Sequence, residues 1–125
     1  MSPFTQNRKT RRIEKDGKAQ GVISTCKAFP ALRGKKFQAI VKNVSSNGLL
    51  LYLDQPLPPG SIVDWEVTLM AAGKNQRFKL ITEIVWCRVL ANGQQSAGVR
   101  LYREASFDFT VWEHMIFNEI RAREF

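Results

Sequence analysis

The sequence predicts a mainly β protein: a six-stranded antiparallel β-barrel with a flexible basic N-terminal arm and a C-terminal α-helix. Six short apolar or alternating runs recur at nearly regular spacing, which is typical of a barrel or sandwich. Turn-forming sequences separate these runs, and no helical pattern stands between them, which argues against a parallel sheet with crossover helices. The 125 residues correspond to one domain, large enough to bury a core without metal or disulfides.

The N-terminal arm is expected to span residues 1–20, followed by the barrel and helix over residues 21–125. Residues 1–20 are polar and basic, with too little apolar surface to order themselves. Residues 1–42 hold eleven Lys or Arg against two acids, a net charge of +9, whereas residues 43–125 carry −1. This asymmetry favours a phosphate-bearing partner (nucleic acid, nucleotide or anionic lipid), and a solubilising tail is the alternative.

The six strands are expected within residues 22–25, 37–42, 49–53, 63–69, 78–89 and 97–102. Alternation is clearest at residues 63–69, where apolar side chains alternate with Asp64, Glu66 and Thr68. The run from 78 to 89 is expected to contain a β-bulge, because its apolar residues cannot all share one parity. Turn signals stand at residues 45–48, 56–60, 72–75 and 91–93.

A C-terminal helix is predicted over about residues 106–122, with Ser106 or Asp108 as its N-cap. Four apolar side chains fall on one face of this helix: Trp112, Met115, Ile116 and Ile120. We expect this face to pack on the barrel, and a groove-binding helix for a partner is the alternative.

The composition argues against an enzyme and a metal site. Cys26 and Cys87 are 61 residues apart, a spacing that fits neither a zinc site nor a redox pair, so we expect buried free thiols. His114 is the only histidine, and no cluster of carboxylates or nucleophiles stands out. No cofactor is expected. The sequence contains neither a membrane span nor a signal-peptide core, which favours a cytoplasmic protein.

Two short motifs combine residues suited to a nucleotide. Arg8 and Arg12 form R-x-x-x-R, and Asn43, Ser45 and Gly48 form N-x-S-x-x-G at a predicted strand–turn–strand. The arginine fork matches a phosphate or the O6/N7 edge of guanine, and asparagine can donate to and accept from a base. Gly48 would permit a positive φ or a close backbone approach to a ligand. The simpler interpretation is that the second motif only builds a hairpin turn.

In this order, before six strands and a helix, the motifs resemble the PilZ domain family. The resemblance is carried by residues 8–12 and 42–49, with Ile84-Val85-Trp86 and Gly98-Val99-Arg100-Leu101 resembling the family's closing strands. It implies binding of cyclic di-GMP, a bacterial second messenger, by an arm that closes over the barrel. The ligand-binding residues it implies are Arg8, Arg11, Arg12, Asn43, Ser45 and Gly48. Trp86 is either a wall of the site or a core residue.

The function that the resemblance implies is that of a cytoplasmic cyclic di-GMP receptor or adaptor. Ligand binding would order the arm and create a surface for an unidentified effector protein. The thirty residues between Arg12 and Asn43 exceed the gap usual in the family. A ligand-free PilZ-like interaction module therefore stays an alternative. A nucleic-acid-binding barrel is less favoured, because the strands interleave few aromatic and basic residues.

Overall fold

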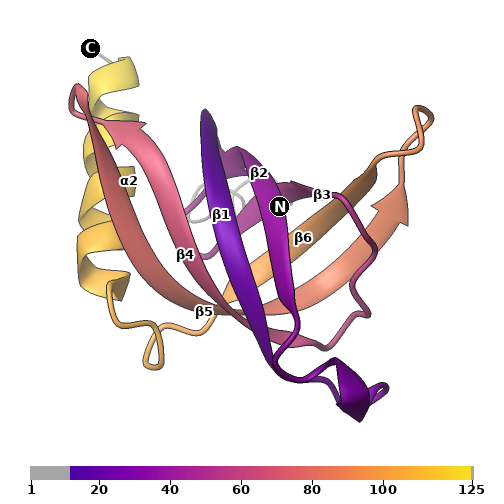
Figure 1. Ribbon diagram of the computed structural model, residues 1–125. Helices are drawn as coiled ribbons and strands as arrows, with labels where there is room; N and C mark the ends of the chain where they lie inside the picture. The colour runs from indigo at the N-terminus through magenta and orange to yellow at the C-terminus, as the bar shows by residue number, and fades with distance from the viewer. Residues whose placement is uncertain (1–11, 125) are drawn as a thin grey trace, which may run out of the picture.

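A computed structural model describes residues 12–124, which form a closed barrel of six antiparallel strands followed by a helix (Figure 1). The elements are β1 (Ile13–Thr25), the 3-10 helix η2 (Pro30–Leu32), β2 (Lys36–Val44), β3 (Gly48–Leu53), β4 (Ile62–Ala71), β5 (Lys74–Val89), β6 (Gln95–Leu101) and α2 (Phe109–Glu124). Around the barrel the strand order is β1-β2-β3-β6-β5-β4. The predicted fold class is confirmed.

The first strand begins at Ile13, which corrects the predicted boundary between arm and barrel at residue 20. β1 pairs with β2 on one side and with β4 on the other. Two positions that face β4 are glycines, and a Cβ at Gly21 would lie 2.6 Å from ring atoms of Trp65. Gly17 is crowded in the same way by Leu69. The large β4 side chains fill this space. The glycines therefore interrupt the alternation of apolar side chains by which the sequence would predict a strand at β1.

The barrel interior holds the apolar members of each alternating strand. In β4, Val63, Trp65 and Val67 are buried while Asp64 is exposed, as the alternation predicts. The indole N–H of Trp65 donates to Thr82 Oγ1 at 2.9 Å, so the buried indole and hydroxyl satisfy each other. The register of β5 against β6 shifts between residues 84 and 86, which confirms the predicted bulge.

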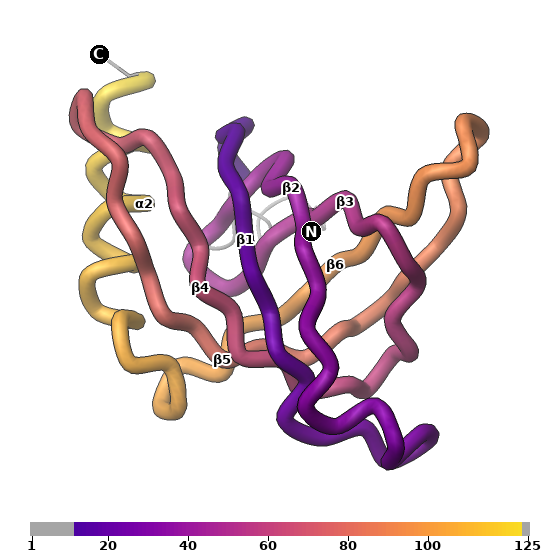
Figure 2. Tube along the Cα trace, viewed as in Figure 1, coloured from indigo at the N-terminus to yellow at the C-terminus, as the bar shows by residue number. Residues whose placement is uncertain are grey.

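The C-terminal helix lies beside the β4–β5 hairpin (Figures 1 and 2). It spans Phe109–Glu124 rather than 106–122. The predicted apolar face packs on the barrel core, with Trp112, Met115 and Ile116 buried and Ile120 partly buried. The Asp108 carbonyl accepts the Trp112 N–H at 2.8 Å, but the carboxylate accepts the N–H of Lys79 on β5 instead of capping the helix.

The described cysteines are both free thiols, and they differ in burial. Cys26 is buried, as predicted, whereas Cys87 is only partly buried and packs against the edge of the core.

Candidate functional site

The β1–β2 hairpin brings the end of the basic arm to the second motif. β1 runs away from Arg12 and β2 returns, so that Glu14 pairs with Asn43. The Arg12 guanidinium donates from Nη1 to Asn43 Oδ1 at 2.9 Å. The long interval between the two motifs is therefore a hairpin, and it returns the chain to the position where it began.

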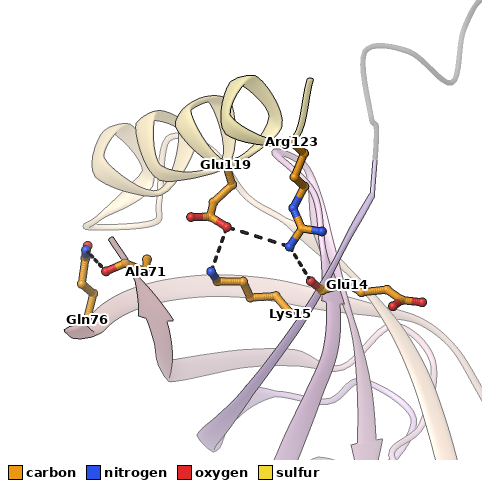
Figure 3. A network of polar contacts seen from close by, with 6 residues as sticks. All are labelled: Glu14, Lys15, Ala71, Gln76, Glu119 and Arg123. Atoms are coloured by element: carbon orange, nitrogen blue, oxygen red, sulfur yellow. Dashed lines mark hydrogen bonds and ion pairs between the residues drawn. The ribbon is translucent and has the colours of Figure 1, made fainter. Parts of the chain in front are cut away.

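The start of β1 is also held by α2 (Figure 3). Lys15 Nζ lies 2.9 Å from Glu119 Oε1, and both side chains are largely buried. Arg123 Nη2 donates to the Glu14 carbonyl oxygen at 3.0 Å and lies 3.9 Å from the same Glu119 oxygen. These contacts fall within an irregular stretch of β1, between Glu14 and Gly17. They fix the backbone directly after Arg12.

Ser45 shapes the turn between β2 and β3. Its side chain is buried, and its hydroxyl accepts the N–H groups of Asn47 at 3.3 Å and Gly48 at 3.1 Å. Its carbonyl accepts the indole N–H of Trp112 at 3.0 Å. The structure therefore supports the turn-building interpretation for this hydroxyl, which is engaged inside the turn.

Gly48 is needed because two strands approach closely. Its φ is not in the positive range, so the expected conformational role is absent. A Cβ at Gly48 would instead collide with the Val99 carbonyl oxygen of β6. The same turn is tied to β6 by the Leu101 N–H, which donates to the Asn47 carbonyl at 2.7 Å.

Beyond Asn43, a row of residues crosses the outer face of the barrel. Asn43 pairs with Leu50, Leu50 with Gly98, and Gly98 with Trp86. The Trp86 ring covers Gly98, where a Cβ would collide with the indole, and Arg88 lies over the same ring at 4.3 Å. Leu50 and Trp86 are half-buried. Trp86 therefore lies on the outer face, in the same row as Asn43, and not in the core.

A polar cluster borders this row on β5 and β6. Arg100 pairs with Gly48 on one side and with Glu83 on the other. Glu83 Oε1 accepts from Arg100 Nη2 at 2.6 Å and from the Tyr102 hydroxyl at 2.8 Å. The hydrogen bond from Tyr102, and next that from Arg100, holds the pKa of the Glu83 carboxyl below its usual value. The same carboxylate raises the pKa values of Arg100 and Tyr102.

The sequence-predicted residues are only partly brought together. Arg12, Asn43, Ser45 and Gly48 share one end of the β1–β2–β3 surface. Arg8 and Arg11 lie outside the described residues. The polar cluster of Glu83, Arg100 and Tyr102 was not predicted as part of the site. Only the strand register reveals that Arg100 stands beside Gly48.

A separate groove of about 450 Å³ lies elsewhere on the barrel. It is lined by β1, β2, β4 and β5 and by the loop before α2, and it contains none of the predicted site residues. Among residues 12–124 no group of three potential metal ligands occurs. Within the same range no helix is long and apolar enough to cross a membrane.

Two of the solved structures that match this chain show the same fold. The inhibitor of motility MotI/DgrA from Bacillus subtilis matches with a TM-score of 0.67 and 10% identity, over 90% of this chain and 49% of that chain. This chain therefore spans about half the length of that protein. The PilZ domain of YcgR from Escherichia coli, a structure with c-di-GMP, matches with a TM-score of 0.59 and 14% identity, over 95% and 96% of the two chains. Comparison with curated proteins gives no significant match.

The barrel, its closing helix and the motif-bearing turn define a small domain of the PilZ-like fold. The PilZ domain family model matches residues 6–109, which include both motifs and all six strands. The chain belongs to the PilZ domain family.

Proposed function

We propose that this protein is a cyclic di-GMP receptor that binds its ligand between the N-terminal arm and the outer face of β2, β3 and β6. Arg8, Arg11 and Arg12 would bind phosphate or guanine from the arm, and Asn43 would bind a base edge from the barrel. Ser45 and Gly48 would shape the turn beneath the ligand. PilZ domains are binding and adaptor modules, and the family resemblance assigns this protein no catalytic step.

The observation that carries this proposal is the contact between Arg12 and Asn43, 2.9 Å from Nη1 to Oδ1. It joins the R-x-x-x-R motif to the N-x-S-x-x-G motif on one exposed surface. Both side chains carry donors that a nucleotide could take over, and arginine suits phosphate and guanine alike. A ligand that replaced this contact would be held from the arm and from the barrel at once.

The output we propose is a new surface for an effector protein. A ligand with two phosphates would neutralise part of the arm's positive charge and hold the arm across the barrel. The same change would bias the chain toward one arrangement of residues 1–12, which an effector can recognise.

A ligand-free interaction module of the same fold is the second candidate. The Ser45 hydroxyl and Gly48 are both explained by the turn itself, without any ligand. The two candidates differ in whether the free protein binds the dinucleotide at all.

Calorimetric titration with cyclic di-GMP tests the proposal. We expect the wild type to bind and Arg12→Ala to bind at least tenfold more weakly, as for loss of a charge-assisted hydrogen bond. Arg33→Ala is the matched control, because Arg33 is exposed at the opposite end of the same hairpin. Absence of wild-type binding would favour the ligand-free module. Binding that is equal in wild type and Arg12→Ala would remove Arg12 from the site.

A further inference from the structure

We propose that Arg100, oriented by Glu83 and Tyr102, is a further arginine of this site and reads the O6/N7 edge of one guanine. The inference rests on the proposed function and adds a specificity-determining residue outside both sequence motifs. It is carried by the strand register and by the contacts of Arg100.

The register places Arg100 on the same outer surface as Asn43. Arg100 is opposite Gly48, and Gly98, two residues away on β6, is opposite Leu50, the partner of Asn43. Two strand spacings across and two residues along the strand separate the α-carbons of Asn43 and Arg100 by roughly 12 Å. Leu50 thus lies between Asn43, which contacts Arg12, and Gly98, which is two residues before Arg100 on β6.

The Arg100 guanidinium is exposed, and its orientation is restrained by Glu83. Its side chain is 61% exposed, yet Nη2 lies 2.6 Å from Glu83 Oε1. The Tyr102 hydroxyl donates to the same oxygen at 2.8 Å and so fixes the carboxylate from the other side. A guanidinium has five N–H donors in a rigid fork, and the contact with Glu83 uses the Nη2 group. An arginine restrained in this way loses little further freedom on binding.

The charge of the cluster favours a base over a phosphate. Glu83 offsets the charge of Arg100, and its carboxylate would repel a phosphate placed nearby. A guanine is neutral, and its O6 and N7 are acceptors matched to the arginine fork. The arm, with its excess of arginine and lysine, is the better partner for phosphate. The cluster thus fits the guanine of cyclic di-GMP, the group that distinguishes this ligand from cyclic di-AMP.

A second cross-strand ion pair on the barrel provides an arginine for comparison that lies outside the candidate site. Arg77 lies 3.9 Å from Glu66, and its side chain is 75% exposed. The pair sits on β4 and β5, away from Gly48 and Asn43. Arg77→Ala is therefore the matched control for Arg100→Ala, since both remove an exposed arginine from a pair with glutamate.

The test compares affinities for cyclic di-GMP and cyclic di-AMP, because adenine presents an amino donor where guanine presents O6. We expect Arg100→Ala to lose about 10- to 100-fold in affinity for cyclic di-GMP, the range for a bidentate arginine–guanine contact. Its affinity for cyclic di-AMP should change little. The selectivity ratio, which is the affinity for cyclic di-GMP divided by that for cyclic di-AMP, therefore falls. Arg12→Ala should weaken both ligands, and Arg77→Ala neither.

Two further variants separate a base contact from other roles. Arg100→Lys keeps the charge and loses the fork, so it should behave like Arg100→Ala. Tyr102→Phe keeps both charges and loosens Glu83, so the selectivity ratio should fall about threefold. Restoration of affinity by Arg100→Lys would overturn the assignment of Arg100 to a base.

The outcomes distinguish this inference from the function on which it rests. If the wild type binds cyclic di-GMP and Arg100→Ala has an unchanged selectivity ratio, the role of Arg100 is overturned. The proposed receptor function is then unaffected. A wild type that binds neither dinucleotide overturns both.

Discussion

At Gly48 the backbones of β3 and β6 approach so closely that any side chain would meet the Val99 carbonyl oxygen. Beside it, the Ser45 hydroxyl accepts the Asn47 and Gly48 N–H groups and closes the turn. These two motif residues set the position of the turn, while Asn43 presents its side chain to Arg12. The motif therefore divides into residues that build the surface and one that contacts the arm.

This division predicts that Gly48→Ala lowers stability more than its small change in size suggests. The Cβ collides with backbone of a neighbouring strand, which cannot move away as a flexible side chain could. Urea unfolding should show a loss of about 3 kcal/mol, the upper end of the range for overpacking. Asn47→Ala in the same turn is the control, because Asn47 is exposed and engages the turn through its backbone. Equal stability of Gly48→Ala and wild type would refute the close approach.

The candidate site could be predicted only where its residues are close in sequence. Asn43, Ser45 and Gly48 lie in or beside one turn between β2 and β3, so their spacing identifies them. Arg100 contacts the same surface through strand pairing with Gly48, and no local pattern marks it. The sequence left open whether this motif binds a ligand or builds the turn, because the answer depends on which hydroxyls and amides become buried.

Among the elements, α2 controls how β1 begins. Figure 3 shows Glu119 and Arg123 reaching from the helix to Lys15 and to the Glu14 carbonyl. Lys15 and Glu119 have side chains 14% and 22% exposed, so their pairing is better shielded from water than a surface pair. The helix thereby fixes the strand residues that follow Arg12.

We predict that Glu119→Ala loosens this junction. The expected loss is about 1.5 kcal/mol, above that of an exposed ion pair, with faster hydrogen exchange at residues 13–16. Glu113→Ala is the matched control, because Glu113 lies in the same helix and pairs with Arg103 at 3.6 Å with both side chains more exposed. Alanine's helix propensity cancels between the two variants. Equal losses of stability, with unchanged exchange at residues 13–16, would contradict the special role of Glu119.

The elements themselves were predicted best where alternation is unbroken. The sequence predicts β4 clearly because its inward positions carry large apolar side chains, at Val63, Trp65 and Val67. In β1 the inward positions 17 and 21 are glycines, since Leu69 and Trp65 occupy the space they leave. The start of β1 was missed because its packing is supplied by another strand.

On the scale of the whole molecule, Trp112 connects the core with the candidate site. It is fully buried, and its ring meets Phe78 of β5 edge-on, with centroids 5.1 Å apart and planes at 85°. Its indole N–H donates to the Ser45 carbonyl at 3.0 Å. Barrel, helix and motif turn therefore share one residue, and we expect them to unfold as one cooperative unit.

Trp112→Ala should cost about 3–5 kcal/mol, the range for removing a buried aromatic side chain, out of a total of about 5–15 kcal/mol for a domain. Trp112→Phe keeps an aromatic ring and removes the donor to Ser45. It should lower the free energy of unfolding by about 1 kcal/mol for the lost hydrogen bond, in addition to a smaller loss from packing. Phe117→Ala is the control, since Phe117 is 57% exposed on the same helix. Urea unfolding followed by circular dichroism and by tryptophan fluorescence should give coincident transitions in every variant. A helix signal that is lost before the barrel signal would show that α2 is a separate unit, and the link through Trp112 would then fail.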